Sequence, residues 1–197
     1  TPLMPRAPLT VELAGQKLTN LLAGPNDRGS QALWLTKAPE GWTGSPPPPA
    51  TEKRRLRGGP FKQAFKNRML FVFGTTGTPE ENTWAIAKAR FDAETWWFRG
   101  NGSVDLLSDR EYGERLKARG RDTASRNAIL YGNADSNSAW QSLLGSAPVQ
   151  VQRNRVRVGS RELRGADLAV LFLHPSPNDA QALVAQEVVA HAALAGG

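Results

Sequence analysis

Two short stretches of this chain share one pattern, and that pattern constrains the fold more than any other feature. Residues 69–77 and 127–135 each begin with an apolar run, break at a glycine (Gly74 and Gly132) and continue into small polar residues. A segment of helical character follows both stretches. This pattern is typical of a buried parallel strand that opens into a loop of an α/β sheet. Because ligands bind at the carboxyl ends of such strands, these two loops are where a small-molecule site is expected.

Composition limits the kinds of chemistry that are open to the chain. It has 197 residues, 40% hydrophobic and 22% charged, which suits one globular domain or one domain with an appendage. No apolar run approaches the roughly 18 residues of a membrane helix, so we expect no membrane partner. The absence of cysteine excludes disulfides, a catalytic thiol and cysteine-ligated metals. With only two histidines, His174 and His191, a three-histidine zinc site within one chain is excluded as well. We expect no metal and no cofactor.

The chain is basic, with a formal net charge of +7 and a pI near 10.2. Such a charge attracts nucleic acid, anionic lipid or acidic partners, or it serves solubility together with local arginine clusters. Two clusters stand out, one at residues 53–57 and one at residues 153–164. No aromatic residues interleave with the first cluster, so it lacks the pattern of a single-strand stacking platform. Solvated charge is the favoured interpretation, and nucleic-acid binding is the less favoured alternative.

Three parts are expected along the chain. Residues 1–45 are predicted to be a β-rich appendage, with a hairpin that turns at Ala14–Gly15 and another strand at residues 31–36. Residues 46–60, rich in proline and arginine, are predicted to be a linker. Residues 61–197 are predicted to form the α/β domain, with strands at 69–73, 103–107, 127–131 and 168–173. The alanine-rich segment after residue 179 is expected to hold a strand at 183–189, with one long helix as the alternative.

The clearest helix signal begins at Thr78. Thr78 is a good N-cap, Pro79 suits the first helical position, and Glu81 completes a capping box. The helix should run to about Phe98. Its sheet-facing side is predicted to carry an aromatic stripe at helical spacing, formed by Trp84, Ala87, Phe91 and Phe98.

A second clear local signal lies at residues 149–158. Apolar and polar residues alternate on both sides of Arg153–Asn154, which predicts a β-hairpin that pairs Val151 with Val156 and Val149 with Val158. Arg155 and Arg157 then share one face with Gln150 and Gln152. That face could contact phosphates or an acidic protein surface, but a solvated face is the favoured interpretation.

The best site hypothesis joins the two glycine loops. If their strands are neighbours, Thr75, Thr76, Asn133 and Asp135 face one crevice, with Gly74, Gly77 and Gly132 shaping the backbone. Neither a Walker loop nor a dinucleotide fingerprint is present. The two glutamates that begin the following helix would repel phosphate, so a neutral or hydroxyl-rich ligand fits better. Turn and cap chemistry alone is the alternative for both loops.

A catalytic role is the second hypothesis. His174 ends an apolar strand on the expected ligand side, where a base could activate water together with Asp135 or a bound metal. No Gly-x-Ser-x-Gly nucleophile motif occurs anywhere in the chain. A hydrolase of esters or lactones would therefore use water and not a serine nucleophile.

From about residue 59 to residue 173, the chain resembles a terminal domain of bacterial prolyl-oligopeptidase-like proteins of the α/β-hydrolase superfamily. The similarity includes Phe73-Gly-Thr-Thr-Gly-Thr-Pro-Glu-Glu-Asn82, residues 59–69 and 87–103, Tyr131-Gly-Asn-Ala-Asp-Ser-Asn-Ser-Ala-Trp140, and the hairpin up to residue 169. The resemblance implies a Rossmann- or flavodoxin-like domain beside a peptidase-like hydrolase module, in a protein that is exported or periplasmic and not cytoplasmic. It supplies no catalytic residues.

The chain departs from that family in two ways. The hydrolase module is missing, and the sequence after residue 173 keeps at most one further strand. We therefore expect a truncated member or a fragment, in keeping with a chain that starts at Thr1 without a signal-like segment. Our first hypothesis is an accessory α/β domain that binds a small polar ligand or a peptidase-like partner domain at the Gly74 and Gly132 loops. The oligomeric state does not follow from the sequence.

Overall fold

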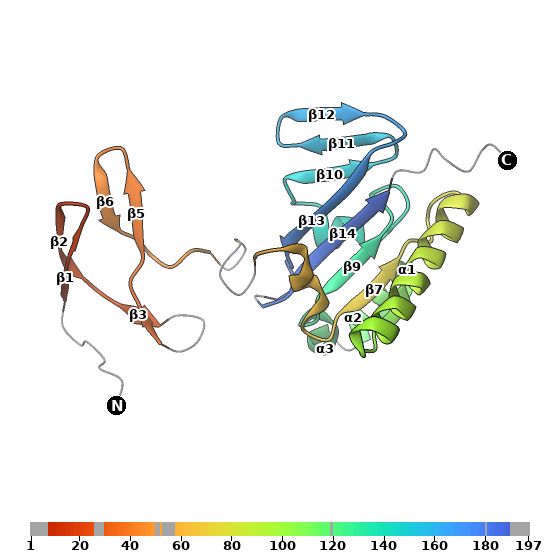
Figure 1. Ribbon diagram of the computed structural model, residues 1–197, viewed down its shortest axis with the longest axis horizontal. Helices are drawn as coiled ribbons and strands as arrows, with labels where there is room; N and C mark the ends of the chain where they lie inside the picture. The colour runs from red at the N-terminus through yellow and green to blue at the C-terminus, as the bar shows by residue number, and fades with distance from the viewer. Residues whose placement is uncertain are drawn as a thin grey trace. The chain divides into compact units, whose positions relative to one another are not determined.

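The fold is taken from a computed structural model, which describes residues 8–25, 30–49, 52, 58–118, 120–179 and 181–189 (Figure 1). The chain divides into two compact units, Thr1–Pro49 and Ala50–Gly197. The basic cluster at residues 53–57 and the second histidine, His191, lie outside the described residues.

Among its described residues, the first unit forms three short antiparallel strand pairs. The predicted hairpin is confirmed: β1 (Leu9–Leu13) pairs with β2 (Gln16–Leu21), and both Ala14 and Gly15 adopt the positive φ that a tight hairpin turn needs. The single strand expected at residues 31–36 is instead divided between two hairpins. Its first half forms β4 (Gln31–Ala32), which pairs with β3 (Gly24–Pro25), and the rest belongs to β5 (Leu35–Ala38), which pairs with β6 (Gly41–Gly44).

One side chain ties the first hairpin to the third. The Gln16 amide donates to the Trp42 carbonyl at 2.8 Å and accepts from the Trp42 N–H at 2.6 Å. Because isolated two-stranded hairpins are at best marginally stable in water, this two-point bond helps to hold the first and third hairpins together.

The second unit contains a five-stranded sheet in the order β13-β14-β9-β7-β8. Figure 1 shows the first four of these strands side by side. Its strands are β7 (Leu70–Phe73), β8 (Asp105–Ser108), β9 (Ala128–Tyr131), β13 (Ala169–Pro175) and β14 (Leu183–Val189). Four of them are parallel, and the edge strand β13 runs antiparallel to β14. This confirms the predicted α/β class, the mostly parallel sheet and the strand at residues 183–189.

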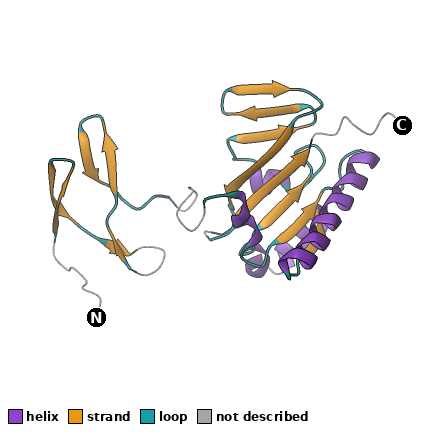
Figure 2. Cartoon of the chain, in the orientation of Figure 1, coloured by secondary structure: helices purple, strands orange, loops and turns teal. Residues whose placement is uncertain are grey.

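Two hydrophobic cores cover the two faces of this sheet. On one face lie α1 (Pro79–Gly100), the long helix in Figure 2, and the short 3₁₀ helix η1 (Phe61–Phe65). On the other face, side chains of α2 (Asp109–Ala118) and α4 (Trp140–Leu144) pack with the β10–β11 hairpin. A further short helix, α3 (Gly120–Ala124), follows α2. Within the described residues, no helix combines the length and apolar character that crossing a membrane requires.

The start of α1 is as predicted, but its buried face is not. Thr78 and Glu81 form the reciprocal capping box, and Pro79 occupies the first turn. The predicted stripe through Ala87, Phe91 and Phe98 is wrong: Phe91 and Phe98 are 63% and 81% exposed. The face that meets the sheet carries small residues, with Ala85 and Ala89 buried and Ala93 packed beside them, and Trp84 and Trp96 at its margins. Small side chains let the helix approach the sheet closely, and the bulkier aromatic residues are left outside.

The predicted hairpin at residues 149–158 is confirmed and extended by a third strand. β10 (Val149–Gln152) pairs with β11 (Arg155–Val158) in the predicted register, with Val151 opposite Val156. Asn154 in the turn has a positive φ. A strand that the sequence pattern did not indicate, β12 (Arg161–Arg164), pairs with β11 to complete a small antiparallel sheet.

Candidate functional site

The two glycine loops lie next to each other, as the site hypothesis required. β7 and β9 are adjacent and parallel, with Phe73 opposite Tyr131, so both loops leave the same edge of the sheet. β8 lies on the far side of β7 and β14 on the far side of β9, so the chain changes direction between these two strands. In open α/β sheets, a crevice at such a position is the usual place for a ligand.

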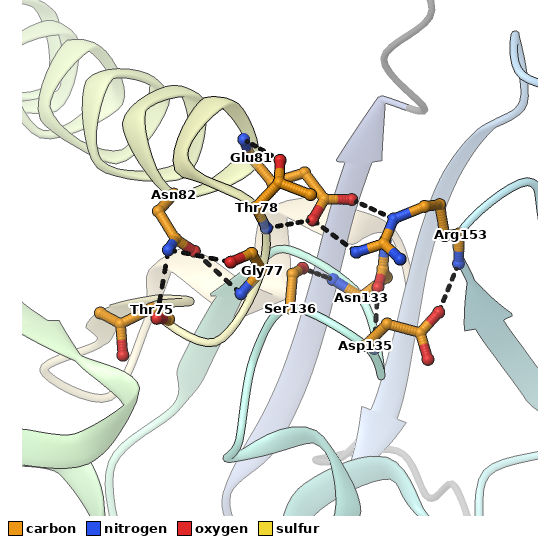
Figure 3. Close-up of polar contacts among 9 residues, drawn as sticks. All are labelled: Thr75, Gly77, Thr78, Glu81, Asn82, Asn133, Asp135, Ser136 and Arg153. Atoms are coloured by element: carbon orange, nitrogen blue, oxygen red, sulfur yellow. Dashed lines mark hydrogen bonds and ion pairs between the residues drawn. The ribbon is translucent and has the colours of Figure 1, made fainter.

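The Gly74 loop is held by side chains of α1 and α2, and Figure 3 shows the contacts that Asn82 of α1 makes with it. The Asn82 side chain accepts from the Gly77 N–H at 3.0 Å and donates to the carbonyl oxygens of Thr75 and Gly77, both at 3.2 Å. The Thr75 hydroxyl donates to Asp109 at 2.6 Å. The loop therefore has a fixed conformation, although Thr75 and Thr76 are exposed.

The Gly132 loop is a closed turn of its own (Figure 3). The Ser136 hydroxyl accepts from the Asn133 N–H at 2.9 Å, and the Asn133 side chain accepts from the Asp135 N–H at 2.8 Å. Gly132 has a φ of 111°, which a residue with a side chain adopts only with strain. Asn133 and Asp135 thus serve turn chemistry in this structure.

The crevice between the two loops is filled by the chain itself. The Thr76 N–H donates to the Ser136 carbonyl at 3.2 Å, and the Gly74 N–H donates to the Tyr131 carbonyl at 3.0 Å. A Cβ atom at Gly74 would lie 2.8 Å from the Ser136 carbonyl carbon and closer still to its oxygen. Glycine is therefore required at position 74 by the close approach of the second loop. The predicted site residues are brought together, but they form a rim around a closed junction.

Asn137, a residue that the site hypothesis did not include, joins both strands beneath this junction. Its side chain is 1% exposed, and its amide donates to the carbonyl oxygens of Val72 at 3.1 Å and Tyr131 at 3.0 Å. Its oxygen accepts from the Ala139 N–H at 3.0 Å. No local signal reveals this role, because Val72 lies 65 residues away in sequence.

Asp109 is the second residue that sequence reasoning missed at this edge. Its carboxylate is 2% exposed and accepts from the Thr75 hydroxyl and, at 2.6 Å, from the Ser138 N–H. A third bond, at 2.9 Å, comes from the Arg110 N–H at the start of α2. Asp109 therefore connects the Gly74 loop to the segment that follows the Gly132 loop.

A two-point ion pair fastens the hairpin to the start of α1 (Figure 3). Arg153 Nε and Nη2 donate to the two Glu81 oxygens at 2.8 and 2.7 Å, while the Arg153 N–H donates to Asp135 at 2.8 Å. The hydrogen bond from Arg153 is the main cause that lowers the pKa of Glu81. The pKa of Arg153 is raised by the same partner. Arg153 thus binds both the Asp135 carboxylate of the loop and the Glu81 carboxylate at the start of α1.

His174 does not lie on the expected side. Because β13 is antiparallel to β14, His174 pairs with Val184, which itself pairs with Ala128 at the amino end of β9. Asp135 follows the carboxyl end of β9. The two residues of the predicted catalytic pair therefore lie at opposite ends of the sheet, and the structure does not bring them together.

The metal and nucleic-acid hypotheses have the following outcome in the structure. Within the ranges that the structure describes, no three His, Cys, Asp or Glu side chains are grouped as metal ligands would be. The arginines at residues 153–164 do not gather on one free surface. Arg153 binds Glu81, and Arg155 and Arg164 pair with Glu162. Arg157 and Arg161 occupy opposite faces of the small β10–β12 sheet, called the ribbon below.

Comparison of the chain with protein-family models, with curated proteins and with solved structures finds no match in any of the three.

Proposed function

We propose that residues 61–197 are a Rossmann- or flavodoxin-like accessory domain of a hydrolase-related protein, and that this domain binds and does not catalyse. One observation carries the proposal: the Ser136 backbone fills the crevice between the Gly74 and Gly132 loops. An enzyme of this architecture needs an open cavity at that position for its substrate. A binding domain needs only a surface of fixed shape.

The rim of the two loops provides such a surface. Thr75, Thr76, Ala134 and Asp135 are exposed. The Asn82 amide donates to the Thr75 carbonyl, the Thr76 N–H donates to the Ser136 carbonyl, and the Asp135 carboxylate accepts from the Arg153 N–H. A surface that is already ordered loses little conformational entropy when a partner binds. The rim is therefore suited to a small polar ligand or a partner domain.

The positions of His174 and Asp135 argue for binding over water activation. A general base must lie within hydrogen-bonding reach of the group that it deprotonates. At about 3.3 Å per residue, β9 alone separates the two ends of the sheet by roughly 10 Å. Neither residue can assist the other across that distance.

The resemblance to prolyl-oligopeptidase-like proteins supports the choice of partner. The similar stretches include both loops, α1 and the hairpin, which are the elements that build the rim. We therefore propose a peptidase-like hydrolase module as the partner and an exported or periplasmic setting.

The first test is turnover. Wild type, His174→Ala and Asp135→Asn are compared on a panel of chromogenic esters, lactones and peptides, with and without EDTA. The proposal predicts no turnover above the buffer rate for any of the three proteins. Wild-type turnover that disappears in His174→Ala would establish the hydrolase instead.

The second test concerns the partner. A purified prolyl-oligopeptidase-like hydrolase module is added as a separate chain, and association is followed by sedimentation velocity. Thr76→Arg places a large charged side chain on the rim and should abolish association. Ser160→Arg makes the same change at an exposed turn of the ribbon and should leave it intact. Equal behaviour of the two variants, or no association of wild type, would refute the rim as the binding surface.

A further inference from the structure

A polar cavity of about 340 Å³ lies beside the Gly132 loop. It is formed between α4 and the β10–β12 ribbon, and it includes Ala134 of the loop at its margin. Its volume is at the lower end of the range of small-molecule sites, which begins at about 300 Å³. The face of the hairpin that carries glutamine and arginine therefore lines a concavity and is not a flat solvated surface.

The floor of the cavity is rigid and its polar atoms are already paired. Trp140 is 1% exposed, and its indole N–H donates to the Gln150 side-chain oxygen at 3.3 Å. The Gln150 amide donates to the carbonyl oxygens of Leu144 and Ala147 at 2.8 and 2.7 Å, which satisfies the end of α4. A ligand would meet a preformed floor here and would not have to order it.

The wall of the cavity carries two arginines in fixed register. Gln152 is opposite Arg155, and Gln150 is opposite Arg157, so all four side chains share one face of the ribbon. The Gln152 side-chain oxygen accepts from the Arg155 guanidinium, which also lies 3.7 Å from Glu162. Arg155 is thus held in place with some of its donors still available.

Arg157 is the residue whose charge is not compensated. Glu162 is directly opposite Arg157 on β12, yet its carboxylate pairs at 2.6 Å with Arg164 and more distantly with Arg155. Among the described residues, the Arg157 side chain has no hydrogen-bond or ion-pair partner, whereas its backbone is part of the sheet. A guanidinium with five donors, on the wall of a cavity whose only carboxylate is already paired, is matched to a carboxylate or phosphate group.

We propose that this cavity binds a small organic anion through its carboxylate or phosphate group, with Arg157 as the principal contact and Arg155 as the second. The inference rests on the proposed function, because it names the ligand class of the binding domain. Carboxylates and phosphates share the two-point geometry that a guanidinium recognises. Citrate tests binding of a carboxylate and inorganic phosphate tests binding of a phosphate group, so the two probes distinguish these two kinds of anion.

The test is a titration of the full chain, labelled with ¹⁵N, with sodium citrate and separately with sodium phosphate. Ionic strength is kept constant with sodium chloride, so that general screening does not change. The indole N–H of Trp140 and the side-chain amide of Gln150 report on the floor of the cavity. We expect saturable shifts of both signals, with at least one probe binding at about 1 mM or tighter.

Arg157→Gln is compared with Arg161→Gln, which removes the same charge from the opposite face of the same ribbon. Arg157→Gln should weaken binding about tenfold or more, because a charged two-point contact is lost, while Arg161→Gln should leave it within about twofold. Equal weakening in both variants would reduce the effect to general charge attraction and overturn the proposal. Absence of saturable shifts in wild type would overturn it as well.

Failure of the anion site can be distinguished from failure of the proposed accessory domain. Turnover lost in His174→Ala would contradict the accessory domain whatever the titration shows. No binding together with no turnover would remove the anion site and leave the accessory domain in place.

Discussion

The carbonyl carbon of Ser136 lies 2.8 Å from the position that a Cβ atom would take at Gly74. This approach closes the crevice between the two loops, and it makes the glycine at position 74 a packing requirement. The obstacle is backbone and not the flexible end of a side chain, so it cannot move aside cheaply.

Gly74→Ala should therefore destabilise the chain by about 3 kcal/mol, the upper part of the range for overpacking. Gly113→Ala is the matched control, because Gly113 lies inside α2 and a Cβ there meets nothing within 4 Å. That variant should be about 0.5–1 kcal/mol more stable than wild type, since alanine favours a helix. Urea unfolding of the three proteins measures both changes. Equal stability of Gly74→Ala and wild type would mean that the crevice is open.

Asn137→Ala should cost about 2–4 kcal/mol, because it removes the donor that the Asn137 amide supplies to the buried carbonyl oxygens of Val72 and Tyr131, of which Tyr131 keeps the Gly74 N–H. Asn137→Asp keeps the size but replaces the donor with an acceptor facing two carbonyl oxygens, and it should destabilise at least as much. The same unfolding experiment applies. An Asn137→Asp protein as stable as wild type would show that the amide does not join the strands.

Two neighbouring tryptophans test the corrected face of α1. Trp96 packs at the sheet-facing side and stacks on Phe65, with ring centroids 5.4 Å apart, whereas Trp97 is 69% exposed. Trp96→Ala should cost about 3 kcal/mol, near the lower end for a buried aromatic residue, and Trp97→Ala less than about 0.5 kcal/mol. Thermal and urea unfolding give the comparison. The reverse order of effects would contradict the assignment of Trp96 to the sheet-facing side of α1.

The Glu81–Arg153 pair predicts a pH dependence. The pKa of Glu81 is lowered in the folded state, chiefly by Arg153. The ionised Glu81 carboxylate therefore stabilises the fold above the unfolded-state pKa near 4.5, and this stabilisation is lost as the pH falls through the folded-state pKa. Arg153→Gln should raise the pKa of Glu81 and lower the free energy of unfolding at pH 7 by about 1 kcal/mol or less, as both side chains are partly exposed. This difference should shrink below pH 4.5.

Carboxyl-carbon NMR titration of Glu81 and urea unfolding across the pH range measure these two effects. Arg110→Gln is the control, because its pair with Glu114 is far more exposed and should contribute almost nothing. A pKa of Glu81 that is unchanged in Arg153→Gln would assign the shift to the capping box with Thr78 instead.

The features that the sequence predicted correctly are local. The capping box of Thr78 and Glu81 depends on four consecutive residues, and the hairpin around Arg153–Asn154 depends on alternation over ten. In each, the side-chain pattern and the backbone geometry are coupled within one element.

The features that were missed depend on tertiary pairing. Whether a strand runs parallel or antiparallel to its neighbour leaves no mark on a short apolar run, so the placement of His174 required the pairing of β13 with β14. The buried face of α1 was predicted wrongly because the size of the side chains, and not their hydrophobicity, determines which face packs against the sheet. The roles of Asn137 and Asp109 rest on contacts 65 and 29 residues away in sequence.

Hydrogen exchange at the Gly74 and Thr76 amides of the full chain is the most direct test of the closed crevice. Both N–H groups donate across the junction, to Tyr131 and to Ser136. The account predicts that both amides exchange far more slowly than unstructured peptide, with protection reduced in Gly74→Ala. Exchange of both at the unprotected rate in wild type would contradict it, because the crevice would then be open to water and to a ligand.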